Sequence, residues 1–156
     1  MHDILPDDQK YWQYILKKAN TILADYAFDK IDTPIVEPSA LFLRTVGDAT
    51  DIIEKEMYTF KVKGGEELAL RPELTASVTR AYLEHGMNVL PHPVKLWYFG
   101  PVFRHDNPQA GRYRQFYQLG VESFGDDNAA ADVEMIILVH SLMQSLGLKN
   151  LSIKIN

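Results

Sequence analysis

Residues 99–125 read FGPVFRHDNPQAGRYRQFYQLGVESFG, which is two runs rich in aromatic and β-branched residues around a short polar loop. Such runs, separated by residues that favour turns, are typical of antiparallel strands. We expect one strand over 94–104 and a second over 113–124. This long hairpin should form the centre of the fold. Three arginines lie at the loop, although the formal net charge of the chain is −5, and their clustering indicates a bound polyanion: Arg104, Arg112 and Arg114.

Side chains alternate between the two faces of a strand, so the even-numbered residues of the second strand share one face. A cation, an aromatic ring, an amide, a glycine and a carboxylate in one row are unusual for a core. They suit a binding site, because arginine binds phosphate bidentately and an aromatic ring stacks on a base. A carboxylate at the far end can hold an ammonium group. The row consists of Arg114, Phe116, Gln118, Gly120 and Glu122.

The even-numbered face of the first strand extends the same row. Arg104 shares this face with Tyr98, and Gly100 between them is expected to leave room for a ligand. The alternation by itself does not distinguish a binding site from ordinary solvated arginines beside a row of core aromatic residues. The combination of three arginines with small residues favours a phosphate-rich, adenine-like ligand that also carries an amine.

The remaining periodicities predict an α+β fold built around an antiparallel sheet. Proline near a helix start and glycine at a helix end mark several boundaries, including Pro72 and Gly86 for one helix. The expected elements are a helix over 7–27, an extended piece over 32–37, a helical turn over 39–44, a polar loop over 46–55, a hairpin over 57–71 turning on Gly64 and Gly65, a helix over 72–85, a helix over 129–146 and a strand over 151–155.

Composition excludes several classes of protein. Apolar residues make up 46% of the 156 residues, cysteine is absent, and no apolar run is long enough to span a membrane. No GxxxxGK[ST] loop, no GxGxxG after a strand and no HExxH motif occurs, so we expect no histidine-based metal site. The length fits one domain, and the final strand-like residues indicate a piece of a longer protein.

The stretch FGPVFRHDNPQAGRYRQFYQLGVE resembles motif 2 of class II aminoacyl-tRNA synthetases, and this version is similar to the histidyl-tRNA synthetase family. MHDILP, VGDATDIIEKEMYTF and LALRPELTA support the resemblance in the same order, over essentially the whole chain. The segment around TPIVE resembles motif 1, through which that class dimerises. The resemblance implies that residues 1–156 form the N-terminal portion of a class II catalytic domain, with motif 3 and the anticodon-binding domain absent.

For ATP, the resemblance implies that Arg104 is catalytic and contacts the α-phosphate and the amino-acid carboxylate. Phe116 would stack under adenine, Asp106 would lie near the adenine edge, and Arg112 would reach the γ-phosphate. Arg114, which the alternation places on the same face, is a further expected ATP contact. Magnesium would accompany the pyrophosphate, and no metal-binding side chain is expected.

For histidine, the resemblance implies a pocket in which Glu122 pairs with the α-amino group of the substrate. The activity implied is ATP-dependent formation of histidyl-adenylate followed by transfer to tRNA(His), in a cytoplasmic homodimer without a membrane association. Leu74 stands where a glycine is familiar and should narrow the pocket. The histidine-binding residues are expected to be Glu73, Leu74, Thr75, Arg104, Gln118 and Glu122.

Two other functions are compatible with the fold. The regulatory subunit of ATP phosphoribosyltransferase senses histidine without charging tRNA, and its members tend to carry Asp where this chain has Glu73. A catalytically inactive synthetase-like domain could serve in tRNA sensing or dimerisation, but the intact arginines and Glu122 speak against it.

Overall fold

The structure is a computed structural model and describes residues 3–45, 56–106 and 111–155. The polar loop expected over 46–55 and the tip of the long hairpin therefore lie outside the described residues. The elements in chain order are α1 (Pro6–Asp25), β1 (Asp29–Lys30), β2 (Val36–Pro38), α2 (Ser39–Thr45), β3 (Tyr58–Lys61), β4 (Glu67–Leu70), α4 (Thr75–Glu84), the short 3-10 helix η1 (Met87–Val89), β5 (Val94–Phe103), β6 (Gln115–Phe124) and α5 (Ala129–Ser145).

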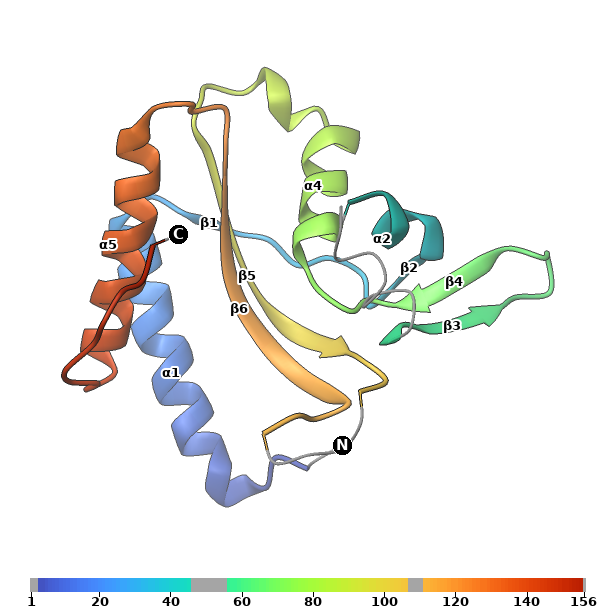
Figure 1. Cartoon of the computed structure of the whole chain (residues 1–156), viewed down its shortest axis with the longest axis horizontal. Coiled ribbons are helices and arrows are strands. Elements are labelled where there is room, and N and C mark those ends of the chain that lie inside the picture. Colours follow the sequence, from blue (N-terminus) through green and yellow to red (C-terminus); the bar gives the residue numbers. More distant parts are fainter. Residues whose placement is uncertain (1–2, 46–55, 107–110, 156) are drawn as a thin grey trace.

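The antiparallel hairpin of β5 and β6 runs through the middle of the molecule (Figure 1). Its register pairs Tyr98 with Gly120 and Gly100 with Gln118, so even-numbered residues of both strands share one face, as the sequence predicted. The two-residue strand β1 joins the other edge of β5 in parallel. This small parallel pair was not predicted.

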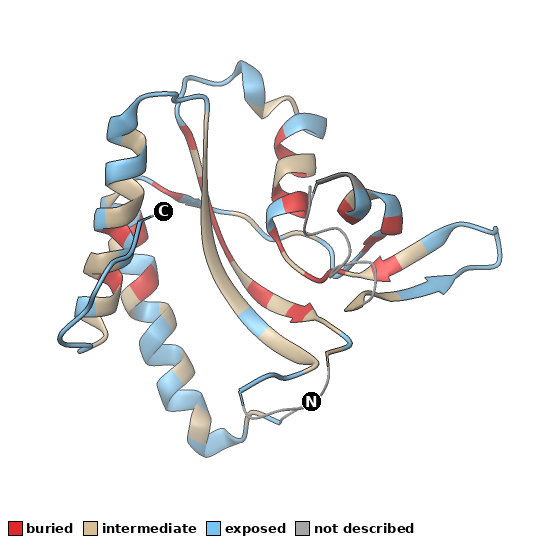
Figure 2. Ribbon diagram, in the orientation of Figure 1, coloured by how far each residue is buried: buried red, intermediate tan, exposed pale blue. Residues whose placement is uncertain are grey.

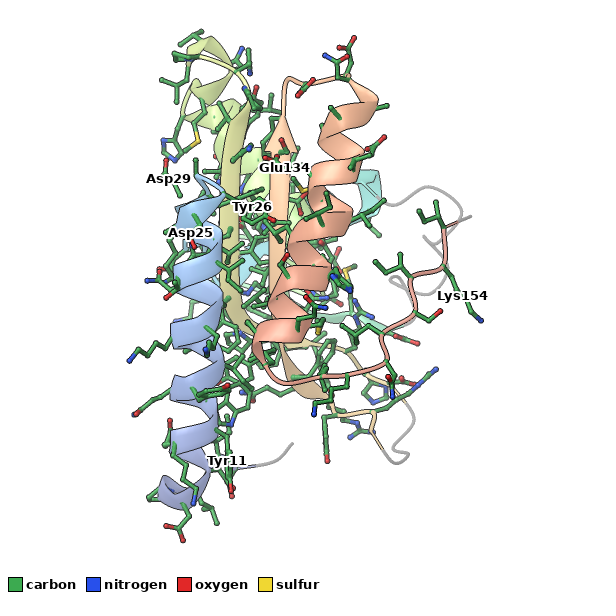
Figure 3. All side chains as sticks on the ribbon, turned by 90° about the vertical axis from the view of Figure 1, so that its left-hand side faces the viewer. Tyr11, Asp25, Tyr26, Asp29, Glu134 and Lys154 are labelled. Carbon is green, nitrogen blue, oxygen red and sulfur yellow. The ribbon has the colours of Figure 1, made fainter. Side chains whose placement is uncertain are left out.

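Helices α1 and α5 lie side by side and cover the odd-numbered face of the hairpin (Figure 3). Lys95 links the two helices by hydrogen bonds, because its Nζ lies 2.7 Å from Glu134 Oε1 on α5 and 3.3 Å from the carbonyl oxygen of Tyr26 after α1. A cation at this position also complements the negative end of the α1 dipole. The buried residues of this layer are Ala19, Leu23, Phe28, Trp97, Leu138 and Leu142.

Helix α4 covers part of the even-numbered face. Its Val78 and Tyr82, with Leu74 directly before the helix, pack on β5, and Tyr82 also stacks on Phe124 at a ring-centroid distance of 4.2 Å. Figure 2 shows the buried residues along β5 and on the side of α4 that faces it. Towards the loop, the even-numbered side chains of β6 stay partly exposed, whereas Val102 on the same face of β5 is fully buried. That uncovered end is where a ligand can approach.

A second, three-stranded antiparallel sheet has the order β2-β4-β3 and lies beside α2 and α4 (Figure 1). Its hairpin, β3 and β4, projects from the molecule and is mostly exposed (Figure 2). Arg80 on α4 pairs with the buried Glu37 of β2 at 2.6 Å. The α+β class is confirmed, but the expected single sheet is in fact two.

Two sequence predictions about elements were wrong. The helix expected from Pro72 begins three residues later, at Thr75, and Pro72 is fully buried in the segment that precedes it. Residues 151–155 form no strand but an exposed segment beside α5 (Figure 3). These residues alternate as a strand would, but no described strand pairs with them, and a strand forms only beside such a partner. No helix in the described part of the chain is long and apolar enough to cross a membrane.

Candidate functional site

An open cavity of about 500 Å³ lies at the loop end of the β5–β6 hairpin. It brings together four of the predicted ATP-binding residues from β6, the end of β5 and the loop between them. The lining also includes Glu56, which precedes β3 and was not predicted. The lining residues are Glu56, Arg104, Asp106, Gly111, Arg112, Tyr113 and Phe116.

Arg104 is fixed in this cavity from two directions. Its main-chain nitrogen donates to the carbonyl oxygen of Arg114 at 3.0 Å, which continues the ladder beyond the strand end. Its Nε donates to the carbonyl oxygen of Pro72 at 2.9 Å, and its guanidinium lies 5.3 Å from the ring centre of Phe116. The cation is therefore held on the ring face by a cation–π contact. An adenine stacking on Phe116 would use the opposite ring face or displace this guanidinium.

The loop residues Arg112 and Asp106, which both line the cavity, form an ion pair at 3.0 Å. The Arg112 side chain is 59% exposed, so an incoming anion can reach it directly. Exchange of one carboxylate partner for phosphate oxygens would involve little desolvation at such an exposed position.

Arg114 does not line the cavity. It is half-buried, and within the described part of the chain its buried Nε has no hydrogen-bond partner. A buried guanidinium nitrogen without a partner is costly, and a ligand oxygen would satisfy it. Its ATP-binding role stays a prediction.

The opposite end of the row centres on Tyr98, which is 7% exposed. Its hydroxyl donates to Glu122 Oε1 at 3.0 Å and lies 3.3 Å from Thr75 Oγ1. Two predicted histidine-binding residues are thus joined through a residue to which the sequence analysis gave no role. Burial, with the nearby Glu122 and Glu73 carboxylates, raises the pKa of Tyr98 to about 12.

The remaining predicted histidine-binding residues take different positions. Glu73 caps α4, because its Oε1 accepts a hydrogen bond from the main-chain nitrogen of Ala76 at 2.9 Å. Leu74 is 2% exposed and packs in the core rather than on an open surface. Gln118 lies midway along the row, opposite Gly100. Glu122 lies six positions beyond Phe116 along β6, so their Cα atoms are roughly 20 Å apart, and the row suits an elongated ligand.

The prediction that Gly100 leaves room for a ligand was wrong. The space above Gly100 holds the guanidinium of Arg71, with which a Cβ at residue 100 would collide. Arg71 is 4% exposed, and burial lowers its pKa against the opposing effect of Asp32 and Glu37. It donates to the carbonyl oxygens of Pro101, Thr33 and Pro34 at 2.9, 2.6 and 3.2 Å. The sequence offered one signal for it, an arginine directly after an apolar strand.

The raised pKa of Tyr98 predicts a loss of stability in strong alkali. Between pH 10 and about 12 the unfolded chain releases the phenolic proton while the folded chain keeps it, so stability falls as pH rises. Two pH units correspond to about 2–3 kcal/mol. Denaturant unfolding between pH 9 and 12 should therefore show a steeper fall for the wild type than for Tyr98→Phe. Equal slopes would contradict the prediction.

Comparisons with known proteins place the chain in a family. The family model for histidyl-tRNA synthetase matches residues 1–156. The histidine–tRNA ligase of Dehalococcoides mccartyi strain BAV1 is 51% identical over 154 residues, which cover 99% of this chain and 37% of that protein. The histidine–tRNA ligase of Desulforudis audaxviator is 53% identical, with 99% and 37% covered. The chain belongs to the histidyl-tRNA synthetase family, and the resemblance drawn from its motifs is confirmed.

Solved structures agree with this assignment. The apo histidyl-tRNA synthetase of Staphylococcus aureus superposes with a TM-score of 0.81 at 43% identity, covering 96% of this chain and 34% of that one. An ATP phosphoribosyltransferase regulatory subunit/histidyl-tRNA synthetase from Bacillus halodurans C gives a TM-score of 0.80 at 29% identity, with 96% and 37% covered. The chain thus spans just over a third of the length of the curated relatives it matches.

Proposed function

We propose that this chain forms the part of a histidine–tRNA ligase that binds ATP and L-histidine for formation of histidyl-adenylate. The observation that supports this most is the even-numbered row of the hairpin. It carries arginines and a half-buried aromatic ring at one end and carboxylates around a buried tyrosine at the other. An elongated ligand with phosphates at one end and a cationic amine at the other matches this order of charges.

In the proposed reaction, a carboxylate oxygen of histidine attacks the α-phosphorus of ATP and pyrophosphate leaves. Arg104 would contact both the α-phosphate and the attacking carboxylate, where negative charge accumulates. Because its Nε is held by the carbonyl oxygen of Pro72, the guanidinium needs little reorganisation as that charge develops. Arg112 would exchange Asp106 for the γ-phosphate, and Phe116 would stack on adenine.

The proposal also includes magnesium, a homodimer and a cellular location. Among the described residues no group of three or more metal-ligating side chains occurs that could hold a metal ion, so magnesium would enter with the phosphates of ATP. Family membership supports a homodimer through the motif 1 region, tRNA(His) as acceptor and the cytoplasm as the location.

The proposal is tested by calorimetric titration of the chain with ATP and with each of a panel of amino acids, together with amino-acid-dependent ATP–pyrophosphate exchange. We expect saturable binding of ATP and of L-histidine, and at least tenfold weaker binding of glutamine, asparagine and lysine. Binding of neither ATP nor histidine would contradict the proposal.

The second candidate is a histidine-sensing regulatory subunit, favoured by the likeness to the Bacillus halodurans structure. Such a subunit would bind histidine but would not catalyse histidine-dependent exchange between pyrophosphate and ATP. The identity near 50% to proteins called histidine–tRNA ligases favours the ligase. Histidine-dependent exchange would exclude the regulatory candidate.

A further inference from the structure

We infer that Tyr98 is a positioning residue of the histidine pocket, which orients Glu122 and Thr75 so that both present hydrogen-bond acceptors to the substrate. This inference rests on the proposed function and deepens it, because it assigns the chemistry by which the pocket selects its ligand. Tyr98 would act through its two neighbours rather than by touching the reacting atoms.

The hydrogen-bond chemistry of the three side chains fixes the direction of the two bonds. A phenol has one proton to donate, and a carboxylate only accepts. The Tyr98 hydroxyl therefore gives its proton to Glu122 Oε1, and Thr75 Oγ1 gives its own proton to Tyr98. Thr75 then has only lone pairs to offer, and Glu122 keeps its second oxygen. A group that binds between them must be a donor, such as an ammonium or an imidazole N–H.

Gly120 makes this arrangement possible. Tyr98 and Gly120 are directly opposite in the β5–β6 register, and the phenol ring crosses the position where a Cβ of residue 120 would lie. A larger residue would push the ring away from Glu122, which is two residues further along the same face. The glycine within a strand, otherwise unfavourable, is thereby explained by close approach of a side chain.

The phenol also remains a donor across the range in which an enzyme works. Its burial and the neighbouring carboxylates raise the pKa of Tyr98 to about 12. The proton that orients Glu122 is therefore retained near neutral pH. The hydroxyl geometry carries the inference, and the raised pKa agrees with it.

The test compares the wild type with Tyr98→Phe, which keeps the ring and removes the hydroxyl. Calorimetry measures the Kd of L-histidine, of histidinol, which keeps the amine and the imidazole, and of ATP. We expect the Kd of histidine and of histidinol to rise about tenfold, as for loss of a hydrogen bond to a charged group, while that of ATP changes less than twofold. Tyr82→Phe, the same change in the same core cluster, is the control and should leave all three values unchanged.

A second variant removes the contact without touching the tyrosine. Gly120→Ala should also weaken histidine selectively, whereas Gly64→Ala, where a Cβ meets nothing within 4 Å, should not. Unchanged histidine binding in Tyr98→Phe would overturn the inference and leave the proposed function intact. Equal weakening of ATP and histidine would assign Tyr98 a structural role only. Absence of histidine binding in the wild type would overturn the proposed function, and this inference with it.

Discussion

Replacement of Arg71 by methionine should lower the free energy of unfolding by about 3 kcal/mol, because it leaves several carbonyl oxygens without their donor. Arg71 is nearly fully buried, and its guanidinium binds three carbonyl oxygens from two separate segments of main chain. Two of the accepting carbonyl groups precede β2, and the third belongs to β5. Methionine keeps an unbranched stem of similar shape, so the loss reports the hydrogen bonds rather than a cavity.

Chemical denaturation of the wild type and of Arg71→Met measures this loss. Arg112→Met is the matched control, because the same chemical change occurs on a side chain that is 59% exposed. An exposed ion pair contributes about 0–1 kcal/mol, so the control should unfold within about 1 kcal/mol of the wild type. A similar small loss for both variants would show that Arg71 is not a structural link.

The long hairpin was the part of the fold that the sequence predicted best. Its strands, over 94–104 and 113–124 in the prediction, are Val94–Phe103 and Gln115–Phe124 in the structure. Strong alternation and a turn-rich loop define both register and faces locally, so little tertiary information was needed. Helices α1 and α5 followed their apolar spacing for the same reason, to within two residues at each end.

The errors occurred where distant segments decide the outcome. The pair β1–β5 and the division into two sheets depend on contacts between residues far apart in sequence, which periodicity does not encode. The helix expected at Pro72 starts at Thr75, where Glu73 supplies the cap. An acidic residue at this position was visible in the sequence, but proline three residues earlier was the stronger local signal.

In the candidate site, too, local patterns predicted correctly and contacts between distant segments were missed. Alternation placed Arg104, Phe116 and Glu122 on one face, and the register agrees. Arg71 and Tyr98 were missed because each acts across elements, Arg71 above Gly100 and Tyr98 above Gly120. Each strand glycine is the sequence signal of a large side chain from elsewhere, and we read one of them as space for a ligand.

Replacement of Arg104 by alanine should have the largest effect on function. We expect histidine-dependent ATP–pyrophosphate exchange to fall by about 10²–10³-fold, the range for removing one preorganised group that stabilises transition-state charge. The reason is local: Arg104 is positioned by the Pro72 carbonyl oxygen and by the Phe116 ring before any ligand arrives. Exchange within tenfold of the wild type would contradict the assignment of Arg104 as the catalytic residue.

Arg104→Lys separates charge from geometry at this position. Lysine keeps the positive charge but lacks the planar fork that binds a carboxylate or a phosphate with two parallel hydrogen bonds. If Arg104 contacts the α-phosphate and the substrate carboxylate together, lysine should recover only a small part of the lost exchange. Nearly full recovery would mean that a point charge is sufficient. The two roles of Arg104 are separated by measuring histidine binding to Arg104→Ala in the absence of ATP. Weaker binding than in the wild type would show that Arg104 contacts the substrate carboxylate. Unchanged binding would leave the α-phosphate as its single partner.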